Sequence, residues 1–216
     1  GEILVRAQTV NQEDRYEDWL ESLPYPLASI LWRHKVSADD PRIRLKTLLQ
    51  FFEGLAEFLA TIHLSAFSSN EENWSQWQKP LLKKLAEQGL SLERATFGTW
   101  KLVVEILSSA ARETIQDPKQ LAVALRLYAT EDDQWLNVLA NAKLSTILSN
   151  ANGIRNKHDG HGGAMGRHQA EEVENELLEM VEQVRNVFGR RWQRNELVLP
   201  DKSEYSGGTF HYQMPR

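Results

Sequence analysis

Residues 154–163 bring together side chains that can bind phosphate and side chains that can move protons. The run reads Ile-Arg-Asn-Lys-His-Asp-Gly-His-Gly-Gly and contains Arg155, His158 and His161. Arginine presents a planar fork of donors that matches phosphate oxygens, and histidine takes up or releases a proton near neutral pH. Glycines let the backbone approach a ligand closely. A phosphate-binding cation beside a proton-transfer group is what cleavage of a ribose phosphodiester requires.

Further candidates lie within and just beyond this run. Asn156 could position a phosphate or a histidine, and Lys157, Arg167 and His168 could contact a substrate. A metal is an alternative ligand for this cluster, since His158, Asp159, His161 and His168 offer nitrogen and oxygen donors. Their spacing fits no established metal motif, so we expect neither a metal nor another cofactor. A purely structural role is also open: an arginine near a helix end offsets the helix dipole.

Apolar residues recur at spacings of three and four from about residue 12 to residue 189, which predicts a mainly helical chain. Asp40 before Pro41 predicts the start of a long helix, because aspartate caps helix N-termini and proline fits the first turn. The last long helix is predicted from about residue 167 to residue 188, with Gly189 as its end.

The chemically interesting run is expected to join two of these helices. Glu131 and its two acidic neighbours predict the first turn of a helix that frays near Asn152 and Gly153. A connection needed only to reverse the chain could be shorter and would require fewer glycines. We therefore expect residues 154–163 to form a loop between the last two long helices.

The fold class that follows is all-α, a bundle of about six to seven helices with a short C-terminal β appendage. Segments 196–199 and 209–214 have the character of short strands, joined through a Ser-Gly-Gly turn. We expect an N-terminal helical lead-in over 1–39, the bundle over 40–189 and the β-hairpin-like segment over 190–216, which could open a further domain.

The composition limits the function classes. The chain has 216 residues, no cysteine and a formal net charge of −5, which excludes disulfides and argues against broad electrostatic capture of a nucleic-acid duplex. No signal segment or membrane-length apolar run is present, so we expect a cytoplasmic protein. Because the chain starts at Gly1 and stops in a strand-like stretch, we expect it to be part of a longer polypeptide. Most of the tryptophans fall on apolar helix faces; only Trp74 with Trp77 suggests a binding surface.

The junction resembles the motif of HEPN domains, in which an arginine and a polar residue precede a histidine by a short spacer. Here Arg155-Asn156 is followed by His161, an apolar helix ends at the pair, and an amphipathic helix follows the histidine. The Leu- and Phe-rich segment 48–59 is similar to the leading helix of such bundles. The resemblance covers about residues 40–189. It departs in the spacer, which is often apolar in the family and is Lys-His-Asp-Gly here, so His158 could replace His161.

The resemblance implies a metal-independent endoribonuclease that assembles its site from two protomers. Arg155 would hold the scissile phosphate, His161 or His158 would be the general acid or base, and Asn156 would position the phosphate or the histidine. Such domains occur in prokaryotic toxin and antiphage defence systems, so RNA, a second copy of the chain and further subunits of such a system are the implied partners. Some members have lost catalysis, and a dimerisation or nucleotide-sensing module of a larger defence or restriction protein is the alternative.

Overall fold

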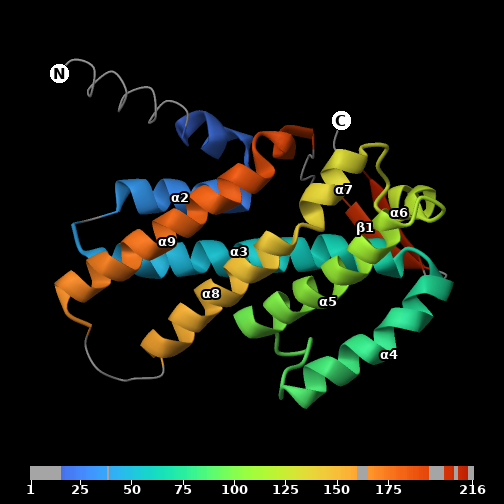
Figure 1. Ribbon diagram of the computed structural model, residues 1–216, viewed down its shortest axis with the longest axis horizontal. Helices are drawn as coiled ribbons and strands as arrows, with labels where there is room; N and C mark the ends of the chain where they lie inside the picture. The colour runs from blue at the N-terminus through green and yellow to red at the C-terminus, as the bar shows by residue number, and fades with distance from the viewer. Residues whose placement is uncertain (1–15, 38, 160–164, 195–201, 207–208, 214–216) are drawn as a thin grey trace.

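The described residues form a bundle of α-helices around one long central helix (Figure 1). The computed structural model describes residues 16–37, 39–159, 165–194, 202–206 and 209–213. The predicted all-α class is confirmed for the described residues between 16 and 194. After a helical segment at 16–22, the helices are α2 (Tyr25–Val36), α3 (Pro41–Ser68), α4 (Glu71–Glu87), α5 (Phe97–Gln116), α6 (Leu121–Leu127), α7 (Asp133–Leu139), α8 (Ala142–Asp159) and α9 (Arg167–Phe188).

The central helix α3 begins where its sequence predicts. The Asp40 side chain accepts a hydrogen bond from the backbone N–H of Arg42 at 3.0 Å, and Pro41 occupies the first turn. Helices α2, α5, α8 and α9 all pack against α3. The apolar side chains that α3 turns toward these neighbours are buried along most of its length: Leu48, Phe51, Phe52, Leu55, Leu59 and Phe67. α3 is therefore the scaffold on which the other helices are placed.

A buried ionic cluster joins three helices at one end of the bundle. Glu174 of α9 is 5% exposed, and its carboxylate accepts hydrogen bonds from Arg44 of α3 at 2.7 and 2.9 Å. His34 of α2 lies 3.0 Å from the same carboxylate. Burial opposes ionisation of Glu174, but the hydrogen bonds from Arg44 and His34 outweigh it and lower the pKa of this carboxyl.

A second buried histidine ties α3 to the end of α6. His63 is fully buried, and its Nδ1 shares a 2.6 Å hydrogen bond with the Tyr128 hydroxyl. Burial lowers the pKa of His63 to about 4, against a partial opposing effect of the Leu139 carbonyl. His63 is therefore neutral at neutral pH, as expected for a histidine on a buried helix face.

The segment after Glu131 forms two helices where we predicted one. Asp132 caps α7 by accepting a hydrogen bond from the Trp135 backbone at 3.1 Å. The chain then breaks at Asn141, whose side chain accepts a hydrogen bond from the Lys143 backbone at 2.9 Å and starts α8. This local bond competes with helix continuation, which is why the described residues contain more helices than predicted.

Aromatic side chains close the far end of α9. Trp192, in the 3₁₀ turn η1 (Arg191–Arg194), stacks on Phe188 with ring centroids 4.4 Å apart. It also meets Trp135 edge to face at 5.2 Å and Phe58 of α3 at 5.4 Å. Core packing thus explains most of the tryptophans. Trp74 and Trp77, considered above as a binding surface, are half-buried and pack against the core.

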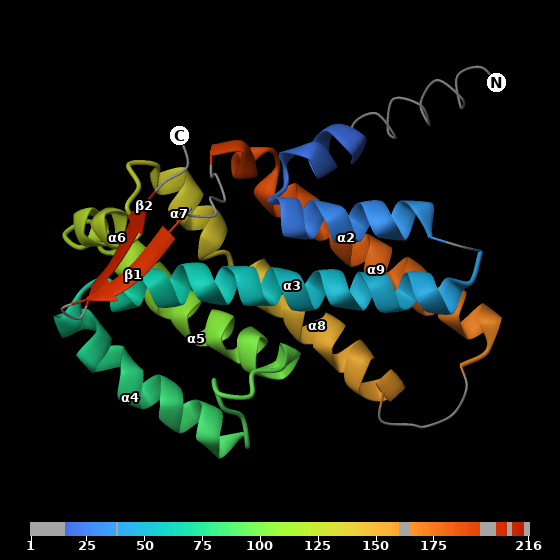
Figure 2. The same ribbon diagram turned by 180° about the vertical axis from the view of Figure 1, so that it is seen from behind.

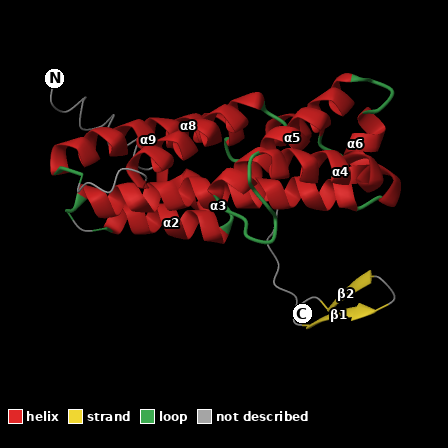
Figure 3. Cartoon of the chain, turned by 90° about the horizontal axis from the view of Figure 1, so that it is seen from below, coloured by secondary structure: helices red, strands yellow, loops and turns green. Residues whose placement is uncertain are grey.

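Strands β1 (Lys202–Ser206) and β2 (Thr209–Gln213) pair antiparallel, with Lys202 opposite Gln213 (Figure 3). Segment 209–214 is thus a strand up to Gln213, whereas segment 196–199 lies outside the described residues. The β appendage as a separate C-terminal unit and the boundaries at 39 and 189 remain predictions.

We expect Glu174→Ala to destabilise the protein by about 3 kcal/mol, because it leaves the Arg44 guanidinium partly buried without its carboxylate. The matched variant is Glu171→Ala, which removes the exposed i,i+4 ion pair with Arg167 and should cost less than about 1 kcal/mol. Urea unfolding at pH 7 measures both. Equal losses in the two variants would contradict a structural role for the buried cluster.

We expect the free energy of unfolding to fall as the pH is lowered from about 6.5 to 4. Over this interval His63 becomes protonated in the unfolded chain but stays neutral in the fold. This difference lowers the free energy of unfolding by about 3 kcal/mol. His34, whose pKa burial also lowers, adds to the same trend. Urea unfolding across this pH range should show a shallower dependence on pH in His63→Asn than in the unsubstituted protein. If the free energy of unfolding depends on pH equally steeply in His63→Asn, His63 is not the source of this dependence.

Candidate functional site

The first residues of the predicted site lie on a helix, not in a loop. α8 runs from Ala142 to Asp159, so the fraying expected near Gly153 is a wrong prediction. Ile154 is 6% exposed and belongs to the core, and this tertiary burial offsets the low helix propensity of the neighbouring glycine. Arg155 and His158 therefore stand one turn apart near the C-terminal end of α8.

Arg155 is anchored to the central helix. Its Nη1 lies 3.2 Å from Oε1 of Glu53 in α3, and both side chains are about one-third exposed, at 31% and 34%. Both side chains of the pair are therefore partly accessible to solvent. The ion pair also holds the arginine in one orientation, which reduces the entropy lost when a ligand binds.

Arg155 borders a polar pocket of about 440 Å³ between α8 and the start of α5. Asn156, predicted as a site residue beside it, lines the same pocket. The full lining consists of Gln88, Leu90, Thr96, Gly98, Lys101, Asn152, Arg155 and Asn156. Seven of these eight residues are polar or glycine, so the pocket suits a hydrophilic ligand rather than an apolar one.

The pocket contains two cations, Arg155 and Lys101, and each of them is paired with a carboxylate. α5 begins at Phe97. A capping box of Thr96 and Thr99 satisfies part of its first turn, and the helix dipole gives that turn a partial positive charge. Lys101 stands one turn further along α5. Its ammonium lies 3.2 Å from Glu105, and its side chain as a whole is 18% exposed. Two cations, two carboxamides of α8 and a helix N-terminus thus meet on one pocket, a set of groups that can bind phosphate oxygens.

The candidate proton-transfer groups are only partly within the described residues. His158 is half-buried on the last turns of α8 and is not among the pocket-lining residues, nor is the exposed Lys157. His161 and the side chain of Asp159 lie outside the described residues. The choice between His158 and His161 therefore stays open.

The predicted contacts on α9 lie apart from the pocket lining. Arg167 pairs with Glu171 at 3.2 Å and donates to the Asp39 carbonyl at 3.3 Å. His168 lies 3.5 Å from Glu172 and is 87% exposed. Both side chains make i,i+4 pairs on the first turns of α9, so a substrate role for them requires a ligand that extends beyond the pocket.

Metal ligation finds no support in the described residues, where no group of three or more His, Asp or Glu side chains is arranged to hold an ion. Two of the four residues considered as ligands, His161 and Asp159, have side chains outside that part of the chain.

Sequence reasoning missed Lys101, Asn152 and Glu53, all of which shape this site. Lys101 and Glu53 belong to helices far from Arg155 in sequence and reach it only through the packing of α5 and α3 against α8. Asn152 offered a signal: it lies three and four residues before Arg155 and Asn156, on the same helical face. The predicted fraying of the helix near residue 152 would have removed this shared face, but α8 continues to Asp159.

Comparisons with protein-family models, with curated proteins and with solved structures find no match to this chain. The similarity to HEPN domains therefore rests on the residues alone and remains a prediction. In the described residues, no helix combines the length and apolar character needed to cross a bilayer.

Proposed function

We propose that this chain is a HEPN-type endoribonuclease that cleaves RNA without a metal ion, through attack of the ribose 2′-hydroxyl. The observation that carries the proposal is the pocket in which Arg155 and Asn156 meet Lys101 and the N-terminus of α5. These are groups that neutralise a phosphate and stabilise the charge it gains during attack. Cytoplasmic action in a prokaryotic defence or toxin system is part of the same proposal.

Each residue would have a defined task in the reaction. Arg155 binds the non-bridging oxygens of the scissile phosphate, and Asn156 orients them. A histidine, His161 or His158, removes the proton of the 2′-hydroxyl as its oxygen bonds to phosphorus, and an acid protonates the departing 5′-oxygen. The products are a 2′,3′-cyclic phosphate and a 5′-hydroxyl, so one phosphorus–oxygen bond forms and one breaks.

A second protomer would complete this site. Attack needs a base and an acid on opposite sides of the phosphorus. Within one protomer Arg155 is already paired with Glu53, so a second protomer would supply the remaining groups. A two-fold arrangement of α8 ends would bring two arginines and two sets of histidines around one phosphate. This is why we include a homodimer in the proposal.

The Arg155–Glu53 ion pair favours a second candidate function, a non-catalytic module for dimerisation or nucleotide sensing. A carboxylate beside the arginine competes with phosphate, and the net charge of −5 weakens the attraction of a long RNA. Such a module would bind a nucleotide in the pocket and leave it intact.

The test is incubation of purified protein with short mixed-sequence RNA in excess EDTA, followed by analysis of the product ends. We expect 2′,3′-cyclic phosphate termini. Arg155→Ala should slow their formation by about 100-fold, because it removes the group that stabilises the developing charge. One of His158→Ala and His161→Ala should have an effect of about the same size.

Lys143→Ala is the matched control, because it removes an exposed cation from the first turn of the same helix and should retain full activity. Cleavage that needs Mg²⁺, or that survives both Arg155→Ala and the histidine substitutions, would refute the proposal. RNA binding without cleavage in the unsubstituted protein would favour the sensing module.

A further inference from the structure

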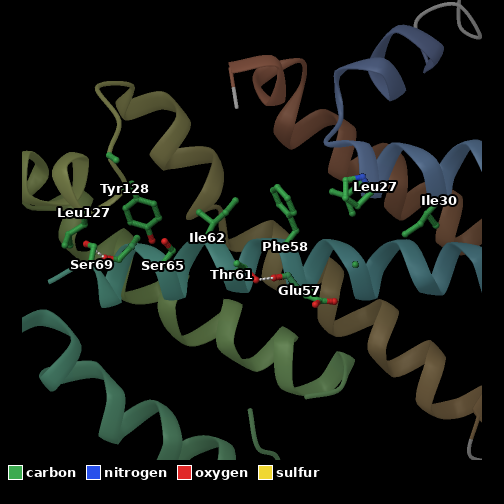
Figure 4. Close-up of a pocket in the computed structure, with 14 residues that line it drawn as sticks. Leu27, Ile30, Glu57, Phe58, Thr61, Ile62, Ser65, Ser69, Leu127 and Tyr128 are labelled. Atoms are coloured by element: carbon green, nitrogen blue, oxygen red, sulfur yellow. Dashed lines mark hydrogen bonds between the residues drawn. The ribbon is translucent and has the colours of Figure 1, made fainter. Parts of the chain in front are cut away.

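An apolar groove runs along the side of α3 that faces away from α5 and α8. Figure 2 shows α3 in front of these two helices, and Figure 4 shows the groove on this exposed side. The groove has a volume of about 790 Å³ and reaches from α2 to the turn after α6. Its lining extends from Gly54 of α3 to Ser69, the cap residue just after this helix, a length of about 22 Å. The groove is thus separate from the Arg155 pocket.

Two parallel rows of α3 side chains form the groove, each with a spacing of four residues. The outer row is polar and exposed, and consists of Glu57, Thr61, Ser65 and Ser69. The inner row is apolar and at least half-buried, and consists of Phe58, Ile62 and Ala66. Rows with this spacing are the ridges into which side chains of a second helix interdigitate.

The opposite wall is apolar at both ends. Leu27 and Ile30 of α2 stand at one end of the groove, and Leu127 with Tyr128 stand at the other (Figure 4). The Tyr128 hydroxyl is hydrogen-bonded to His63, so it is chiefly the aromatic ring of Tyr128 that lines the groove. Apolar side chains are therefore required in whatever occupies the groove.

The polar row indicates a helix rather than a compact small molecule. It follows the groove over its whole length instead of gathering at one point, as the polar groups that orient a small ligand do. The hydroxyls of Thr61 and Ser69 donate to carbonyls of their own helix at 2.8 and 2.7 Å, so neither demands a partner. Small, internally satisfied side chains let another backbone approach closely.

The charge on the groove rim indicates which residue types a binding partner would carry. Glu57 carries the only charge among the described residues that line the groove, and the chain as a whole has a net charge of −5. A complementary helix would place a lysine or arginine opposite Glu57 and apolar residues over Phe58 and Ile62.

We infer that this groove docks an amphipathic helix of a partner protein, with apolar residues at spacings of three and four and a basic residue that faces Glu57. This is the helix-in-groove mode of recognition, in which one apolar helix face is buried and the charged rim sets the register. Because α3 separates the groove from the Arg155 pocket, such a partner could bind while the pocket holds its ligand. The inference does not depend on the proposed nuclease activity.

The experiment is a selection from a displayed library of random peptides long enough to span the groove. We expect enriched sequences with the helical apolar period and at least one lysine or arginine, which bind the unsubstituted protein and not Ser65→Arg. Ser65 is exposed, so the arginine blocks the groove without entering the core. Enriched peptides that lack this period, or that bind Ser65→Arg equally well, would overturn the inference.

A charge reversal then tests the register with one selected peptide. Glu57→Lys should weaken its binding by about tenfold, and replacing the peptide's basic residue by glutamate should restore binding to this variant. Glu113→Lys, an equal change of charge at an exposed position of α5, should leave the affinity unchanged. Equal weakening by both protein variants would show nonspecific attraction and overturn the inference. The inference would also be overturned if palmitate bound in the groove and every selected peptide bound elsewhere on the protein.

Discussion

Burial of α3 is the constraint on which the rest of the structure depends. Among the described residues, helices α2, α4, α5, α8 and α9 contact it, and each of them acquires its place from the apolar side chains that α3 presents. Two positions on α3 illustrate the result. Glu53 faces α8 and holds Arg155, whereas Glu57, one turn further on, lies on the rim of the open groove. One helix thus supplies a wall to two surfaces with different chemistry, one polar and suited to an anion, the other apolar and suited to a helix.

Much of the fold could be predicted where local chemistry decides the outcome. Asp40 before Pro41 starts α3, and Gly189, at a φ of +53°, ends α9 as predicted. The prediction was wrong where distant contacts decide. Nothing local reveals that Ile154 is buried or that Arg155 meets Glu53, and these contacts extend α8 beyond Gly153. Tertiary packing outweighs helix propensity at such positions because propensity differences are about 1 kcal/mol or less per residue.

The candidate site was predictable only in its local half. Arg155 and Asn156 attract notice because of their residue types, and both line the polar pocket. Lys101 supplies a second cation from α5, and its place became visible only when α5 was packed against α8. The Glu53 carboxylate is equally distant in sequence, yet it governs how strongly Arg155 can attract phosphate. Any ligand must compete with this ion pair, which ties the affinity of the site to the scaffold helix itself.

We propose that the pocket between α5 and α8 binds a phosphate of RNA. The most direct measurement is an NMR titration of the ¹⁵N-labelled protein with a short 2′-O-methyl oligoribonucleotide, which lacks the attacking hydroxyl and stays intact. We expect amide shifts that saturate and that concentrate at residues 96–101 and 152–156. Amide shifts that fall elsewhere on the bundle, or the absence of any shift that saturates, would contradict this proposal.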